Sequence, residues 1–405
     1  MINLSLNKKV LLFGFIFTFF SSFGQSFFLG LFNPSIRNEL NITHGQFGTI
    51  YAFATICSSL LLVWFGKKID EYRLFNYSLI VVGILFFSSF FFSLIYNVYF
   101  LIIAIFLMRF SGQGLMSHTS STTISRYFNK RRGRALSGIW FGLSSAEFIL
   151  PILVVFLLTI FSWRLIWQFI SLIILFVLPI VVFYTIRNLT IDSREGQDLI
   201  VKKKKLKDIK NWKRSEVIKD FKFYIISLNM LAMPWIATGV FIYQSFIAES
   251  KLWDTFVIPK SFMVYSVSSI LTLISSGFLV DKFTSIKMIP FINLPLLLGL
   301  IILYFFNVSF SAFLFFGLIG ISNGLANVLG ASTWAEIYGV RYLGSIRALT
   351  TALMVFSTAF GTALFGVLID NGFTIEFIAL ISILYVGFAL LALLAIKGSL
   401  RPKIQ

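Results

Sequence analysis

The sequence predicts an all-α polytopic membrane protein with about twelve transmembrane helices, arranged as two six-helix pseudo-repeats. Three observations lead to this fold class: the composition, a series of long apolar segments, and loop motifs that occur twice. Of the 405 residues, 58% are hydrophobic and 12% are charged, and the mean hydropathy is +0.90. A soluble domain of this length needs far more charged surface, so lipid is the expected solvent for most side chains.

Twelve segments are long and apolar enough to cross the hydrocarbon core, which takes about 20 residues in a helix. They must be helical, because lipid offers no partner to unpaired backbone groups and the segments are too long for barrel strands. In the first half they are 10–32, 45–65, 74–96, 98–124, 135–161 and 165–186. In the second half they are 223–247, 261–280, 286–306, 310–334, 345–369 and 374–396.

The distribution of Lys and Arg predicts the orientation. Of 34 such residues, 29 fall in the N-terminal, C-terminal and alternate loop segments, 4 fall in the opposite loops, and Arg109 lies within a span. Both termini are therefore expected in the cytoplasm, with the protein in the cell inner (plasma) membrane. The same loop lysines explain the net charge of +18 without a nucleic-acid partner.

Composition also argues against an enzyme. Cys57 is the one cysteine, and the two histidines, His44 and His118, are far apart, so the sequence predicts no metal site and no cofactor. No Gly-rich nucleotide loop and no membrane-embedded Ser/His or paired-Asp site is evident.

Loop motifs recur at a nearly constant offset, which indicates an internal duplication. Gly66-x-x-x-Asp70 recurs as Gly277-x-x-x-Asp281, 211 residues later, and Arg134-Ala135-Leu136 recurs as Arg347-Ala348-Leu349, 213 residues later. Tyr127, Lys130 and Gly133 likewise match Tyr338, Arg341 and Gly344. We therefore expect an N-terminal bundle (1–190), a cytoplasmic linker (191–222) and a C-terminal bundle (223–405). Parallel duplications of this kind are typical of secondary transporters.

With these motifs in place, and with the basic run from Arg126 to Arg134, the chain resembles the major facilitator superfamily along essentially its whole length. The resemblance implies alternating access, with spans 1, 4, 7 and 10 lining a central cavity. It also implies a gating role for the loop residues at the cytoplasmic rim. The predicted gating residues are Gly66, Asp70, Arg134, Gly277, Asp281 and Arg347.

Two charged residues near the middle of consecutive spans are the main candidates for function. A charge at the centre of a transmembrane helix costs at least about 2.5–3.5 kcal/mol, so Arg109 in span 4 and Glu147 in span 5 should face water or a partner. We expect Arg109 to bind substrate, because a guanidinium fork suits a carboxylate. Glu147 is the candidate for proton coupling. The alternative is a static Arg109–Glu147 ion pair.

Polar amides in the spans complete the predicted substrate site. Gln113 lies one turn after Arg109, and the others are Gln25, Asn229, Gln244, Asn323 and Asn327. For each of them, an interhelical hydrogen bond is the alternative interpretation.

The sequence thus predicts a monomeric secondary transporter that moves a small solute, with protons and the lipid bilayer as its other partners. Its leading form is proton-coupled uptake (symport) of a small organic anion such as a monocarboxylate. Proton-driven efflux of a lipophilic drug or metabolite is one alternative, and a non-transporting membrane receptor on the same fold is another.

Overall fold

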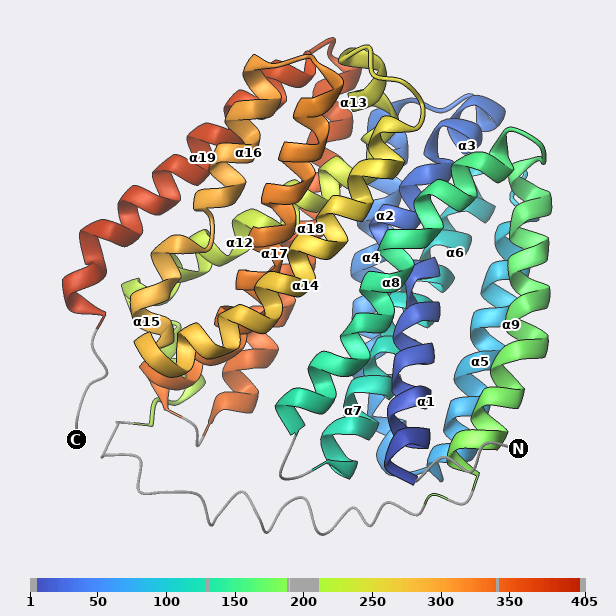
Figure 1. Cartoon of the computed structure of the whole chain (residues 1–405), viewed down its shortest axis with the longest axis horizontal. Coiled ribbons are helices and arrows are strands. Elements are labelled where there is room, and N and C mark those ends of the chain that lie inside the picture. Colours follow the sequence, from blue (N-terminus) through green and yellow to red (C-terminus); the bar gives the residue numbers. More distant parts are fainter. Residues whose placement is uncertain (1–5, 129–131, 188, 190–210, 340–341, 401–405) are drawn as a thin grey trace. The chain divides into compact units, whose positions relative to one another are not determined.

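A computed structural model describes residues 6–128, 132–187, 189, 211–339 and 342–400. The described residues form helices and connecting turns, and they include twelve helices long and apolar enough to span a membrane. The predicted fold class and span count are confirmed. The chain divides into two compact units, Met1–Lys203 and Lys204–Gln405 (Figure 1).

The first unit contains six spans, of which the first and fourth are interrupted. Helix α1 packs against α7, α8 and α9, α5 against α9, and α4 against α6. Its elements are α1 (Leu6–Ser21), η1 (Ser22–Gly24), α2 (Ser26–Leu29), η2 (Gly30–Phe32), α3 (Asn33–Leu40), α4 (His44–Phe65), η3 (Gly66–Asp70), α5 (Leu74–Phe92), α6 (Val98–Met108), η4 (Arg109–Met116), α7 (Ser117–Tyr127), α8 (Arg132–Leu158) and α9 (Trp163–Ile186).

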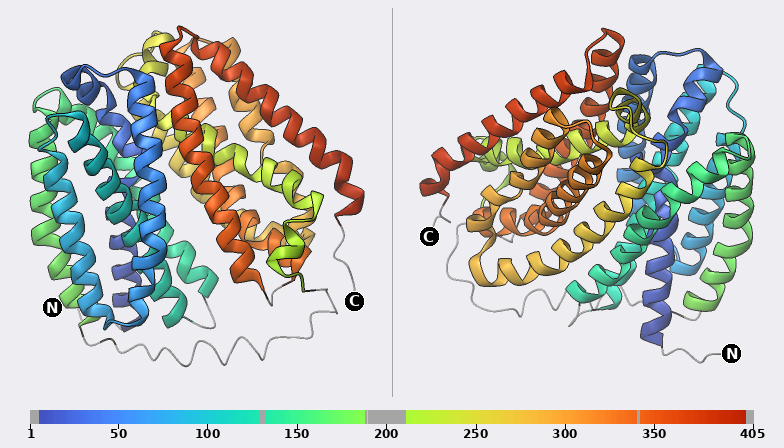
Figure 2. Two further views of the ribbon diagram at one scale, coloured as in Figure 1. Left: turned by 180° about the vertical axis from the view of Figure 1, so that it is seen from behind. Right: turned by 45° about the horizontal axis from the view of Figure 1, so that its top comes forward.

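The second unit repeats this plan. Helix α14 packs against α17, α12 against α18, and α16 against α17 and α19 (Figure 2). Its elements are α11 (Arg214–Val217), α12 (Phe221–Ile242), α13 (Gln244–Ser250), α14 (Val257–Phe283), α15 (Ser285–Met288), η5 (Ile289–Phe291), α16 (Leu294–Phe305), α17 (Ser309–Tyr338), α18 (Leu343–Asp370), α19 (Ile375–Ile396) and η6 (Lys397–Ser399).

Polar residues fix where several spans begin. The first N–H groups of a helix have no intrahelical acceptor, and a side-chain oxygen just before the helix supplies one. Thr43 and Gln46 form a reciprocal capping box at the start of α4. Asn97 accepts from the Phe100 N–H at 3.0 Å before α6, and Asp220 accepts from the Lys222 N–H at 3.2 Å before α12.

Equivalent tyrosines join the first and fourth spans of each unit. Tyr127 Oη donates to Asn7 Oδ1 at 2.9 Å, and Tyr338 Oη donates to Asp220 Oδ2 at 3.0 Å. The tyrosines are 211 residues apart and their acceptors 213 residues apart. The duplicated sequence therefore makes the same contact twice.

Candidate functional site

The first transmembrane segment is broken near its middle. Helix α1 ends at Ser21, a short 3-10 turn follows, and Gln25 has extended backbone angles (φ −83°, ψ 153°) before α2 begins. We expected one continuous span over 10–32, and the structure corrects this. A break at membrane depth leaves backbone groups that only protein or enclosed water can satisfy.

The fourth segment departs from α-helical geometry at the same place. Residues Arg109–Met116 form a π-helical stretch, a rare conformation that is frequent at functional sites. Gly112 in this stretch lies directly against Gly24 of the broken first span. A Cβ built on Gly24 would lie 2.3 Å from Met108 O and 2.9 Å from Gly112 Cα. The two backbones are therefore in contact, and only glycine allows it.

Arg109 lies at this junction. It is 4% exposed, Nη1 donates to Gly24 O at 3.1 Å, and the guanidinium carbon lies 5.1 Å from the centre of the Tyr51 ring. The ring stabilises the cation by a cation–π contact. Within the described part of the chain, Arg109 Nε and Tyr51 Oη have no hydrogen-bond partner. A buried cation therefore retains an unused donor.

Glu147 is buried in α8 and is 7% exposed. The ion pairs found in the described ranges do not include one between Glu147 and Arg109. The static Arg109–Glu147 pair that we weighed from the sequence is therefore not formed. Each of these charges is buried without an opposite charge bound to it.

Other polar groups lie on the spans that meet at Arg109. Thr55, one helical turn after Tyr51 on α4, and Ser22 in the break have buried hydroxyls without a partner among the described residues. Gln25 and Gln113 are half-buried. We did not single out Tyr51 or Thr55 from the sequence. Their i,i+4 spacing in an otherwise apolar span was the available signal.

In the second unit, the predicted amides take separate roles. Asn293 Nδ2 donates to Asn229 O at 2.6 Å and to Asn229 Oδ1 at 3.1 Å, so Asn229 joins span 7 to span 9. Asn323 donates to Ser269 Oγ at 3.0 Å, whereas Asn327 is exposed. For Asn229 and Asn323, the structure shows the interhelical hydrogen bonds that were the alternative interpretation.

Gln244 follows a second break, at Tyr243, where α12 gives way to α13. Gln244 is 2% exposed, and its Nε2 donates to Phe241 O at 2.8 Å. The tripeptide Gln244-Ser245-Phe246 repeats Gln25-Ser26-Phe27, which follows the break in span 1. Both units thus place a glutamine directly after an interruption of their first span.

The predicted gating residues at the cytoplasmic rim are anchored within their own unit where they are described. His118 Nε2 lies 3.1 Å from Gly66 O, and Asp70 forms an ion pair with Arg126. A Cβ on Gly66 would lie 3.3 Å from His118 Nε2, which fits the predicted need for glycine. His118, a conceivable proton carrier by sequence, thus binds a loop carbonyl.

The matching loop of the second unit is held differently. A Cβ on Gly277 would meet nothing within 4 Å, so the close approach that we predicted for this glycine is absent there. Glu336 instead accepts from the N–H groups of Ser285 at 3.0 Å and Ile286 at 3.2 Å, which caps α15. Arg347 is exposed, and the side chains of Arg134 and Asp281 lie outside the described residues.

Comparisons with known proteins agree on the family. Residues 14–362 match the family model described as Major Facilitator Superfamily. Crystal structures of two transporters superpose on nearly the whole chain. One is a bacterial homolog of the human lysosomal transporter Spinster, in an inward-facing and occupied conformation (13% identity, 96% of this chain, 93% of that chain, TM-score 0.67).

The other is the nucleoside transporter NupG (14% identity, 96% of this chain, 99% of that chain, TM-score 0.68). No curated protein sequence matches the chain. The family match covers most of the sequence, and the structural similarity supports the same fold. The chain belongs to the major facilitator superfamily, and it is a multi-pass membrane protein of a family that transports small molecules.

Proposed function

We propose that the protein is a secondary active transporter that takes up a small organic anion, such as a monocarboxylate, together with protons by alternating access. Arg109 is the proposed anion-binding residue, with Gln25, Gln113 and Gln244 as further substrate contacts. The loop residues around Gly66 and Gly277 are proposed to contribute to gating. We further propose a monomer in the plasma membrane with both termini in the cytoplasm.

The observation that carries this proposal is a buried cation without an anion. Arg109 is 4% exposed, its Nη1 is engaged by a backbone carbonyl, and its Nε has no partner in the described structure. A guanidinium can present two parallel N–H groups to one carboxylate, a geometry that lysine cannot provide. Binding of an anion there would compensate a charge that is costly to bury.

Ligand binding to purified protein tests this assignment. Thermal unfolding would be recorded with lactate, pyruvate and benzoate at constant ionic strength, and with uridine as an uncharged probe. A ligand at a hundred times its Kd stabilises the folded state by about 2.7 kcal/mol. We expect a carboxylate to stabilise the protein, Arg109→Lys to respond weakly and Arg109→Gln not to respond. Equal stabilisation of Arg109→Gln would refute the site.

Glu147 is the proposed proton-coupling residue. A buried carboxylate without a cation is costly, and uptake of a proton removes its charge. One proton that moves down a potential of 100 mV releases about 2.3 kcal/mol, enough for roughly a fifty-fold concentration ratio. In vesicles, Glu147→Gln should still exchange labelled lactate but should not accumulate it under a pH gradient.

The control for this experiment is Glu249→Gln, because Glu249 is an exposed acid at the end of α13. That variant should accumulate lactate like the unmodified protein. Undiminished accumulation in Glu147→Gln would exclude Glu147 as the coupling residue.

The same unpaired acid favours one alternative. A buried carboxylate that is not bound to Arg109 is the feature expected of an exporter of lipophilic cations. Proton-driven flux of tetraphenylphosphonium that depends on Glu147, without lactate flux, would establish this alternative. Ligand binding without flux of any probe would indicate a receptor.

A further inference from the structure

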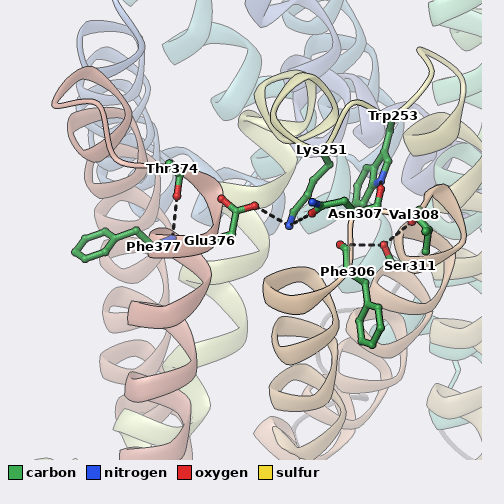
Figure 3. A network of polar contacts seen from close by, with 9 residues as sticks. All are labelled: Lys251, Trp253, Phe306, Asn307, Val308, Ser311, Thr374, Glu376 and Phe377. Carbon is green, nitrogen blue, oxygen red and sulfur yellow. Dashed lines mark hydrogen bonds and ion pairs between the residues drawn. The ribbon is translucent and has the colours of Figure 1, made fainter.

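A buried lysine ties three external segments of the second unit together. Lys251 directly follows α13, is 2% exposed, and lies 2.8 Å through Nζ from Glu376 Oε1 in the first turn of α19. Nζ also donates to Asn307 Oδ1 at 2.7 Å, in the turn between α16 and α17. Figure 3 shows the ammonium group between these two partners.

Neighbouring contacts fix the partners. Trp253 Nε1 donates to Asn307 O at 2.6 Å, so the same asparagine is held from both its side chain and its backbone. Thr374 caps α19 by accepting from the Phe377 N–H at 3.4 Å, which orders the turn that carries Glu376 (Figure 3). A fully buried lysine is rare unless it is paired. Loss of either partner would leave an ammonium group that is costly to bury.

The backbone is distorted to bring Lys251 inward. Leu252 has φ 54° and is 93% exposed, and the Trp253 N–H closes the turn on Ala248 O at 2.9 Å. The left-handed region is unfavourable for leucine, and exposure of its side chain adds to the cost. This arrangement turns Leu252 outward while Lys251 and Trp253 are buried.

The first unit makes the equivalent contact with the charges reversed. Glu39 and Arg164 lie 212 residues before Lys251 and Glu376, and they too form an ion pair. Trp163 Nε1 also donates to Glu39 Oε2 at 2.8 Å. Each unit therefore joins the external end of its first span to the start of its last span, with opposite polarity.

The helix that Lys251 anchors carries a proposed substrate contact at its other end. Helix α13 runs for seven residues, Gln244–Ser250, which corresponds to a length of about 10 Å. Its inner end adjoins Tyr243, whose Oη donates to Thr362 O of α18 at 3.0 Å. The helix is thus held at Tyr243 and at Lys251, with a break in span 7 beside Gln244.

We propose that Lys251 is a positioning residue: its ion pair with Glu376 and its bond to Asn307 hold α13 in place and thereby set the position of Gln244. The anchoring follows from the contacts alone. The consequence for substrate rests on the proposed function, in which Gln244 contacts the transported anion.

Hydrogen–deuterium exchange of the peptide that covers 244–250 tests the anchoring without any ligand. We expect exchange to become about 10–100-fold faster in Lys251→Gln and in Glu376→Gln, since local opening costs less there. Lys260→Gln, which changes an exposed lysine of α14, is the matched control and should leave this peptide unchanged. Unchanged exchange in both Lys251→Gln and Glu376→Gln would overturn the anchoring.

Charge reversal provides the sharper test. Lys251→Glu should be the most disruptive single change, because two acids would then face each other. The double variant Lys251→Glu/Glu376→Lys recreates the polarity that Glu39 and Arg164 already have, and should return exchange to within about threefold of the unmodified protein. A double variant as disturbed as Lys251→Glu would contradict a tie whose polarity can be reversed.

Lactate kinetics in vesicles separate positioning from mere stability. Positioning predicts that Lys251→Gln raises KM for lactate about tenfold while the thermal midpoint changes little, and that the charge-reversed double variant recovers KM. Faster exchange with an unchanged KM would refute the positioning role while keeping the anchor. If the unmodified protein does not transport lactate, the proposed function fails, and the exchange data alone decide the anchoring.

Discussion

Substitution of Gly24 by alanine tests the junction between the broken first span and the π-helical segment. The added Cβ would lie 2.3 Å from Met108 O and 2.5 Å from Gln113 N, whereas ordinary contact begins at 3.4 Å. These atoms belong to the backbone and cannot rotate away. The two segments must therefore separate by about 1 Å, which is an overpacking defect of the kind that costs about 1–3 kcal/mol.

The separation also weakens the bond that holds Arg109. Gly24 O accepts from Arg109 Nη1 at 3.1 Å, and a hydrogen bond to a charged group contributes about 1.5–3 kcal/mol. The two effects are coupled, so we take about 3 kcal/mol as the expected loss of stability. For a unit of this size, that corresponds to a fall of roughly 6–12 °C in the thermal midpoint.

The assay is thermal unfolding of purified protein, together with carboxylate binding. Gly83→Ala is the matched control, because a Cβ on Gly83, in α5, would meet nothing within 4 Å. We expect the control to be neutral or slightly stabilising, since alanine is the better helix former. If Gly24→Ala unfolds and binds carboxylate like Gly83→Ala, the described contact and the argument for Arg109 are both wrong.

Three further predictions concern contacts outside the proposed substrate site. Tyr338→Phe should cost about 1.5–3 kcal/mol by thermal unfolding, more than Tyr127→Phe, because its lost acceptor is a carboxylate and its side chain is more deeply buried. Asn293→Ala should cost about 1–3 kcal/mol, because it removes both bonds to a fully buried partner; an unchanged midpoint would contradict that pairing. Partial burial raises the pKa of Glu39, but its hydrogen bonds and ion pair outweigh this and hold the pKa below the ordinary value of 4.5. Its contribution is therefore present above that pH and lost as the pH falls through the lowered pKa, so Glu39→Gln should destabilise by up to about 1 kcal/mol at pH 7 and not at all near pH 3.

The sequence was sufficient for the twelve spans and the duplication, because both are repeated many times over along the chain. Long apolar segments are dictated by bilayer thickness, and tyrosines at a fixed offset make equivalent contacts in both units. Hydropathy does not report helix breaks, however. Neither the extended Gln25 nor the π-helical stretch at Arg109 changes the apolar character of its span.

The sequence was least informative about which polar groups meet. Arg109 and Glu147 were singled out because charges at membrane depth are costly, yet sequence spacing could not decide whether they pair. Lys251 was counted only as an external loop charge, because burial of a loop residue depends on three segments that are distant in the chain. Its match to Glu39 also escaped notice, because the two residues have opposite charges.

The most direct test of the central claim is lactate counterflow in vesicles that contain Arg109 variants. Counterflow needs no proton gradient, so it separates anion binding from coupling at Glu147. We predict that Arg109→Gln loses at least about tenfold in exchange rate at low lactate concentration, and that Arg109→Lys recovers only part of it, because the charge returns without the two-pronged donor. Counterflow in Arg109→Gln equal to that of the unmodified protein would contradict the claim that Arg109 binds the substrate.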